Sequence, residues 1–366
     1  MIKVVHTSDL HLDGSFLEDR RLNDRRCRER RALFVNIMMY ARDRSVDVLL
    51  IAGDFFDGLM PERETAELIV REFENTPGTE IFISPGRNDP YRPGSFYATQ
   101  RFPSNVHIFK SDRMEGILVD RLGLTVDGYA FTGRNMEKNP MAVMPVVDNR
   151  RINLLCGYAD DGEKDGLFEL TPLQIGNTGV DYAAFGGRHE ASELQKEKEV
   201  PFAFSGAPEG NGFGEWGNKG VRLVAIEKSQ GQCAFNSKTM RFSRRHYEKK
   251  TVDVSAFSSV HELLSTLSDD FRSSEYDPDT ILELELVGRV PLQFGVISRD
   301  LFEKIGAKLY YLQISDRTVV DFEIKEDTKD IREGFATALT GLCQRDTDLF
   351  DKAMKAGLAA LEGKPF

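Results

Sequence analysis

Four acidic and imidazole side chains in this chain suggest metal-assisted chemistry. Asp9 and His11 lie two positions apart in Thr7-Ser8-Asp9-Leu10-His11, Asp54 lies in Gly53-Asp54-Phe55-Phe56-Asp57, and His189 ends Gly186-Gly187-Arg188-His189. Carboxylate and imidazole ligands together suit manganese, iron or zinc, and such an ion activates water for attack on phosphorus. Each residue alone has a simpler structural explanation, such as capping a turn. The four together predict a metal site.

Short apolar runs precede these motifs, as buried strands would. Val4-Val5, Val48 to Ala52 and Ile81 to Ile83 are continuous and apolar, which is typical of strands covered on both faces. Two amphipathic helices are predicted between them, one around Leu33 to Ala41 and one opened by Pro61, giving βαβαβ order. Further strands are predicted at Ile152–Leu155 and Tyr182–Phe185. Ligands bind beyond the carboxyl ends of such strands, where the polar motifs fall.

Composition indicates a globular protein of two domains. The chain has 366 residues, 40% of them hydrophobic and 29% charged, and this length exceeds one ordinary core. The formal net charge of -11 argues against a protein that coats nucleic acid through bulk charge, but allows a local basic groove. Cys27, Cys156, Cys233 and Cys343 lack paired spacing, so neither a disulfide framework nor a cysteine-rich zinc module is expected. With no apolar leader visible, we expect a cytoplasmic protein that does not enter membranes.

The composition changes near Arg244-Arg245-His246, where we place a domain boundary after residue 246. A small α+β domain is predicted for residues 247–326. Its strands are expected at Thr251–Val254, Ile281–Val287, Tyr310–Ile314 and Val319–Ile324, and its helix is expected to begin at a capping box of Ser259 and Glu262. Residues 327–366 are predicted to be helical and amphipathic. That segment either packs on its own domain or docks a partner.

The polar motifs resemble those of the calcineurin-like metallophosphoesterases and, within them, of the SbcD-type DNA-repair exonucleases with their shorter YhaO-like relatives. The resemblance covers nearly the whole chain. It rests on the segments Ser8–Asp13, Ile51–Asp57, Asn105–Phe109, Ser205–Glu209, Phe213–Glu215 and Lys219-Gly220. It implies a four-layer α/β/β/α sandwich for residues 1–246 and a capping domain for 247–326. The helical segment 327–366 would then meet an SbcC-like coiled-coil ATPase.

Members of this family hold two metal ions, and the resemblance implies that only one site is complete here. Asp9, His11, Asp54 and His189 match the ligands of one ion, with Asp54 in the bridging position. Arg87, Cys156 and Gly187 stand where the other ion has its unshared ligands. One site thus keeps all of its ligands, whereas the other has lost each ligand that the two sites do not share. We therefore expect one ion, most readily Mn²⁺, with iron or zinc as alternatives.

The replaced positions leave several interpretations open. The Arg87 guanidinium either supplies part of the missing positive charge and grips a phosphate oxygen, or points to solvent. Cys156 could ligate a softer ion as a thiolate, although Gly187 offers no side chain to help. If the alignment is shifted by one position, Asn88 stands where the family has its asparagine ligand. Without the shift, Asn88 stands where the family has a histidine, and the resemblance implies that this histidine donates a proton or stabilises phosphate. Asparagine cannot act as a general acid near neutral pH.

The family resemblance implies in-line attack on a phosphodiester, and two functions of different classes follow. The first is an SbcD-type metal-dependent DNA exonuclease with weakened activity, working with an SbcC-like ATPase. The second is a catalytically silent relative that serves as a DNA-binding or assembly subunit of such a complex. A small-molecule phosphoesterase is a third hypothesis, which the extra domain and helical tail disfavour. A homodimer is compatible with all of them.

Seven arginines gather just after the first motif and are the clearest basic cluster: Arg20, Arg21, Arg25, Arg26, Arg28, Arg30 and Arg31. The simpler interpretation is a solvated helix start with Asp24 paired to Arg28. The functional interpretation is a contact with the nucleic-acid backbone, for which Arg25 and Arg28 are the candidates.

Overall fold

The computed structural model describes residues 1–366 except 16–19, 137, 145, 160–167, 169, 217–218, 274–275, 293, 295–305, 322–329, 343–346 and 362–366. The chain divides into two compact units, Met1–Arg244 and Arg245–Phe366. This division lies two residues before the boundary placed from the sequence. Cys27, Cys156 and Cys233 are free thiols, and Cys343 lies outside the described residues. Within the described ranges, no helix has the length and apolar character needed to span a membrane.

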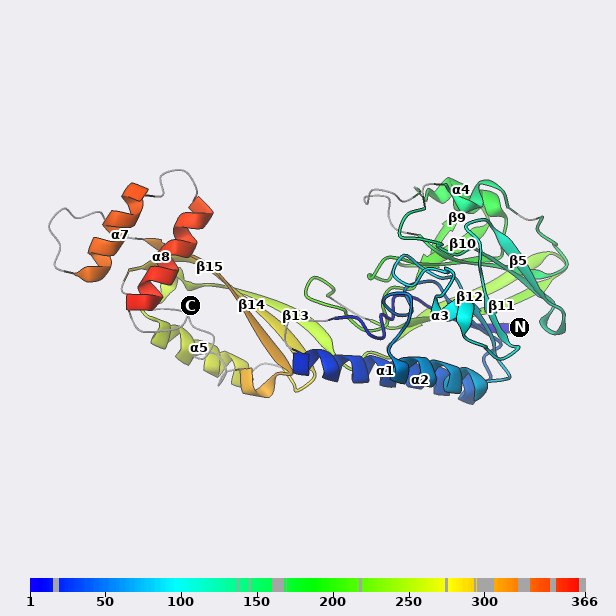
Figure 1. Ribbon diagram of the computed structural model, residues 1–366, viewed down its shortest axis with the longest axis horizontal. Coiled ribbons are helices and arrows are strands. Elements are labelled where there is room, and N and C mark those ends of the chain that lie inside the picture. Colours follow the sequence, from blue (N-terminus) through cyan, green and yellow to red (C-terminus); the bar gives the residue numbers. More distant parts are fainter. Residues whose placement is uncertain are drawn as a thin grey trace. The chain divides into compact units, whose positions relative to one another are not determined.

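The first unit is built on two six-stranded sheets (Figure 1). The first sheet has the order β12-β11-β1-β2-β3-β4, and β1 to β4 run parallel. Its strands are β1 (Ile2–Thr7), β2 (Val48–Ile51), β3 (Glu80–Ile83), β4 (Val106–Ile108), β11 (Val221–Ser229) and β12 (Gln232–Met240). The connecting helices α1 (Arg20–Asp43) and α2 (Arg63–Glu74) confirm the βαβαβ order expected from the apolar runs.

The second sheet has the order β5-β6-β7-β8-β10-β9. Its strands are β5 (Glu115–Val119), β6 (Leu124–Gly128), β7 (Ile152–Tyr158), β8 (Tyr182–Gly186), β9 (Gln195–Glu197) and β10 (Val200–Phe204). The short helices of this unit are α3 (Phe96–Thr99) and α4 (Pro172–Thr178). The two strands predicted after residue 150, which are β7 and β8, therefore belong to this second sheet and not to the first.

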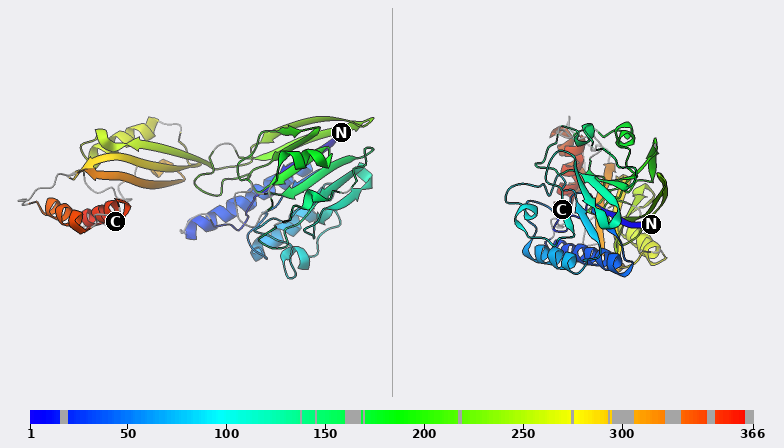
Figure 2. Two further views of the ribbon diagram at one scale, coloured as in Figure 1. Left: turned by 90° about the horizontal axis from the view of Figure 1, so that it is seen from above. Right: turned by 90° about the vertical axis from the view of Figure 1, so that its right-hand side faces the viewer.

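Three apolar clusters hold these layers together. α1 and α2 lie side by side (Figure 2) and pack Phe34 and Phe73 onto one face of the first sheet. Between the sheets, Leu50 and Phe82 meet Leu154. Ile175 of α4 packs on the outer face of the second sheet. The unit is thus the α/β/β/α sandwich that the sequence predicted, and both sheets deliver parallel strand ends from which loops carry the polar motifs.

The second unit contains a three-stranded parallel sheet of β13 (His246–Asp253), β14 (Thr280–Pro291) and β15 (Tyr311–Asp321). Figure 2 shows α5 (Val260–Ser273) on one face, with α7 (Ile331–Leu342) and α8 (Thr347–Leu361) on the other. At the start of α5, the Glu262 backbone N–H donates to Ser259 Oγ, while the Glu262 carboxylate accepts from Ser258.

One strand prediction was wrong in this unit. Tyr310–Ile314 and Val319–Ile324 were expected as two strands, but β15 runs without a break from Tyr311 to Asp321 in register with β14. The polar segment between them is tolerated because β15 is an edge strand with one side open to solvent. Residues 322–324 lie outside the described part. On the tail, Met354 and Leu358 pack against Ala336 and Leu292, so the tail buries apolar side chains within its own unit.

Candidate metal centre

The loops that follow β1 and β2 run side by side and bring the first motifs together. The backbone N–H of Asp9 donates to the Gly53 carbonyl at 2.9 Å, and that of His11 donates to the Asp54 carbonyl at 3.1 Å. These bonds continue the pairing of the two strands beyond the sheet. Asp9, His11 and Asp54 are buried, with 0%, 7% and 1% of their surfaces exposed.

Three of the predicted ligands adopt backbone conformations that side chains other than glycine rarely take. The φ angles are 51° at Asp9, 43° at His11 and 50° at Asp54. Left-handed conformations of this kind cost free energy and persist where the surrounding structure enforces them, often at functional sites. Here the hydrogen bonds between the loops enforce them, and the strain sets the direction of each ligand side chain.

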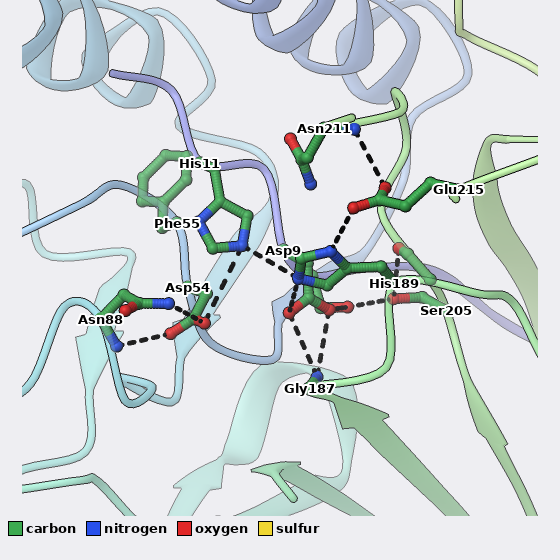
Figure 3. A network of polar contacts seen from close by, with 12 residues as sticks. Asp9, His11, Asp54, Phe55, Asn88, Gly187, His189, Ser205, Asn211 and Glu215 are labelled. Carbon is green, nitrogen blue, oxygen red and sulfur yellow. Dashed lines mark hydrogen bonds and ion pairs between the residues drawn. The ribbon is translucent and has the colours of Figure 1, made fainter. Parts of the chain in front are cut away.

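Asp9, His11 and His189 form a cluster whose ligand atoms all lie within 4.8 Å of one another. The Nε2 atoms of His11 and His189 face each other at 3.2 Å, and His189 Nε2 lies 3.8 Å from Asp9 Oδ1 (Figure 3). Asp54 is not in that cluster, but its Oδ2 lies 3.9 Å from His11 Nε2. The fold therefore assembles the four residues predicted from the sequence, with Asp54 at the edge.

Each of the two histidines is held from behind by a carboxylate. His11 Nδ1 lies 2.7 Å from Asp57 Oδ1, and His189 Nδ1 lies 2.6 Å from Glu215 Oε1. Metal-binding histidines commonly donate their second ring N–H to a carboxylate, which fixes the ring and leaves the other nitrogen to the ion. Both rings thus present Nε2 to the same point. Sequence reasoning assigned no role to Asp57 or Glu215.

The carboxylates in and around the cluster favour positive charge at its centre. Burial raises the pKa of Asp9 to about 6, although both histidines oppose that shift. Burial alone would lower the pKa of His11, but the hydrogen bond to Asp57 and the charges of the three aspartates raise it to about 9. The pKa of His189 is also raised despite burial, because of Glu215 and Asp9. The surrounding carboxylates therefore favour positive charge at the point where the two imidazoles meet.

These residues fit a divalent metal ion. One carboxylate and two imidazoles converge on one point, the Asp9 carboxylate being oriented by the Gly187 N–H, and Asp54 adds a carboxylate beside them. Mixed oxygen and nitrogen donors are typical of manganese, iron and zinc sites. A divalent ion would supply positive charge at the point where the surrounding carboxylates favour it.

Asp54 is held by the turn that follows β3. Asn88 donates its backbone N–H to Asp54 Oδ1 at 2.8 Å and its side-chain N–H to Oδ2 at 2.7 Å. Beneath them, buried Asp89 accepts from the backbone N–H groups of Asp54, Phe55 and Gly86 and from the Tyr97 hydroxyl. Burial and the charge of Asp54 raise the pKa of Asp89 to about 7. Asp89 therefore fixes the loop that carries Asp54, a role the sequence did not indicate.

The positions of the incomplete second site do not converge as ligands. Cys156 lies in the core between the sheets, where burial raises the pKa of its thiol far above the usual range and disfavours a thiolate. Gly187 has a φ of 101°, and its N–H donates to Asp9 Oδ2 at 3.0 Å. Arg87 is half-buried, with no hydrogen bond or ion pair to the described residues.

Much of the arginine cluster serves the fold. Arg26 pairs with Glu29 and Glu209, and Arg31 pairs with Asp13, Glu62 and Glu64. Arg30 is buried and donates to the His11 and Gly14 carbonyls. Arg25 is exposed and lies 3.6 Å from Glu29, whereas exposed Arg28 lines a groove of about 280 Å³ between α1 and α2. The expected ion pair between Asp24 and Arg28 is not present among the described residues.

Comparisons with known proteins agree with this geometry. The family model described as calcineurin-like phosphoesterase matches residues 2–203. The DNA double-strand break repair protein Mre11 of Methanopyrus kandleri is 24% identical over 366 aligned residues, which cover 92% of this chain and 73% of that protein.

Two solved structures match at low similarity. A putative 5'-nucleotidase of Staphylococcus aureus has a TM-score of 0.38 and 11% identity, covering 66% of this chain and 53% of that one. A Vps29 double mutant of Entamoeba histolytica has a TM-score of 0.30 and 11% identity, covering 66% of this chain and all of that one. At such scores, neither structure bears on function.

Proposed function

The chain belongs to the calcineurin-like phosphoesterase family, and we propose that it is an SbcD-type phosphodiesterase that acts on DNA ends with one divalent metal ion. The observation that carries this proposal is the cluster of Asp9, His11 and His189, with a carboxylate behind each ring. The similarity to an Mre11 protein supports DNA as the substrate class.

The chain's own residues would divide the work in this centre. Asp9, His11, Asp54 and His189 would hold the ion, which would polarise the phosphorus and lower the pKa of water. Asp57 and Glu215 keep the imidazoles in the orientation that exposes Nε2. Arg87, half-buried in the same turn as Asn88, is proposed to grip a phosphate oxygen through its fork of donors. Asn88 donates to Asp54 and cannot protonate a leaving group.

One ion rather than two is proposed for this centre. Asn88 occupies both carboxylate oxygens of Asp54 with hydrogen bonds, Cys156 is buried as a thiol, and Gly187 has no side chain. The absence of a second metal ion and the absence of a general acid would each reduce the rate by a factor of about 100 or more. We therefore propose weak Mn²⁺-dependent activity, with iron or zinc as alternative ions.

The same observations favour a second function, in which the protein is a silent subunit that binds DNA or assembles with a partner. Asn88 in place of a proton donor is the specific observation in its favour. In either role, we propose a cytoplasmic protein working with an SbcC-like coiled-coil ATPase, contacted through the helical segment 327–366. A homodimer stays a prediction.

Cleavage of an end-labelled DNA duplex with Mn²⁺ tests the first function. We expect slow cleavage by the unmodified protein and none by His189→Ala, whereas His261→Ala, an exposed histidine of the other unit, behaves as the unmodified protein does. Equal cleavage by the unmodified protein and His189→Ala contradicts the proposed site. No cleavage above His189→Ala, with metal still bound by the unmodified protein, favours the silent subunit.

Contact of DNA with Arg25 and Arg28 is tested separately. If both side chains contact phosphates, replacing them with alanine lowers DNA affinity and makes its dependence on salt less steep by about two units of slope. Arg63→Ala, an exposed arginine of α2 paired with Glu67, is the matched control. A salt dependence that does not change in the double variant removes the two arginines from the DNA contact.

A further inference from the structure

The side-chain amide of Asn211 has no hydrogen-bond partner in the part of the chain that the structure describes. Its Oδ1 and Nδ2 are both shielded from water, and neither makes a hydrogen bond to the described residues. Buried polar groups are nearly always paired, so an exception in a native fold needs an explanation such as a bound ion. Figure 3 shows the carboxamide directed toward the side of the centre where His11 and His189 face each other.

The backbone around Asn211 is fixed rather than loose. The Asn211 N–H donates to Glu215 Oε2 at 2.9 Å, and the other oxygen of that carboxylate holds His189 at 2.6 Å. One residue earlier, the Gly210 carbonyl accepts from the fully buried Arg26 at 3.1 Å. A single carboxylate therefore positions both a predicted ligand and the unpaired amide, which ties Asn211 to the centre.

The chemistry of the centre indicates what the amide would bind. The cluster offers one carboxylate and two imidazoles, and the oxygens of the neighbouring Asp54 already accept from Asn88. Divalent ions that prefer oxygen take more ligands than these three, and asparagine carbonyl oxygens are among them. Because solvent does not reach the amide, an ion held inside the centre suits it better than a group of a diffusing substrate.

We propose that Oδ1 of Asn211 is a further ligand of the divalent ion in this centre, an inference that rests on the proposed metal site. A half-turn about the Cβ–Cγ bond exchanges Oδ1 and Nδ2, and with neither atom bonded this rotation breaks no hydrogen bond. Asn211 would then join Asp9, His11, Asp54 and His189 as a fifth ligand.

Isothermal titration of the metal-free protein with Mn²⁺ tests this ligand, with no need for catalysis. Asn211→Ala should bind Mn²⁺ at least about tenfold more weakly, because losing even a hydrogen-bond partner of a metal ligand typically costs about 10- to 100-fold. Asn211→Asp should bind it more tightly, because it places a negative charge at the same point. Asn149→Ala, an exposed asparagine of the same unit, should bind as the unmodified protein does.

Thermal unfolding without metal separates a ligand from a structural residue. The Asn211→Ala protein should unfold at the same temperature as the unmodified protein or a higher one, because it lacks two unpaired buried atoms. A lower unfolding temperature with unchanged Mn²⁺ affinity would show a structural role and overturn the proposal. If His189→Ala loses Mn²⁺ and neither Asn211 variant differs from the unmodified protein, the centre stands and Asn211 is not a ligand. If the unmodified protein binds no Mn²⁺, both proposals fail.

Discussion

Neutralising the carboxylates that contact His11 and His189 should lower metal affinity at the proposed centre without removing a ligand. Glu215→Gln and Asp57→Asn keep the size of the side chains but turn a charged hydrogen bond of 2.6 or 2.7 Å into a neutral one. A hydrogen bond to a charged group contributes about 1.5–3 kcal/mol and a neutral one about 1 kcal/mol. The difference, about 0.5–2 kcal/mol, corresponds to a loss of about two- to thirtyfold in metal affinity.

The two variants should differ in a direction set by burial. The Glu215 side chain is 18% exposed and that of Asp57 is 38% exposed, so solvent screens the charge of the Glu215 carboxylate less. Glu215 also accepts from the Asn211 backbone. We therefore expect Glu215→Gln to lose about thirtyfold in affinity and Asp57→Asn about tenfold.

Calorimetric titration with Mn²⁺ measures both losses at one pH and ionic strength. Glu227→Gln, which changes an exposed carboxylate on β11, serves as the matched control and should not alter affinity. The reasoning is refuted if both variants bind as tightly as the control, or if Asp57→Asn loses clearly more than Glu215→Gln.

Three further expectations concern the scaffold. Tyr97→Phe removes the 2.6 Å bond to Asp89 and should cost about 1.5–3 kcal/mol in urea unfolding, with no loss being the contrary result. Burial, then the charge of Arg222, lowers the pKa of His6 from 6.5 to about 3. The neutral imidazole therefore makes its full contribution to the free energy of unfolding above pH 6.5 and loses it as the pH falls toward 3. Stability should therefore fall by about 1.4 kcal/mol per pH unit below about pH 6, and His6→Gln should flatten that slope. Gly186→Ala would drive a Cβ into the Ala52 carbonyl oxygen and should cost about 3 kcal/mol, seen as a lower melting temperature.

The sequence predicted the first unit well where each signal was local. Continuous apolar runs located β1, β2 and β3, and the motif at each strand end located Asp9, His11 and Asp54. Strand ends were informative because parallel strands place successive loops at one edge of a sheet.

What the sequence missed depends on contacts between distant segments. Glu215 meets His189 across 26 positions and Asp57 meets His11 across 46, and no local pattern reports such a pairing. Asp89 acts through three backbone N–H groups, which are invisible in composition. The separation of the strands into two sheets likewise depends on which runs pair, and the continuous β15 depends on its register with β14.

The left-handed backbone of Asp9 has an evolutionary consequence. Asparagine adopts positive φ more readily than almost any other side chain except glycine, so Asp9→Asn would keep the loop while taking a negative charge from the centre. One nucleotide substitution can make that exchange. On the proposed function, a single mutational step would therefore turn the enzyme into a scaffold, and the same exchange would give experimenters a folded variant with a weakened metal centre.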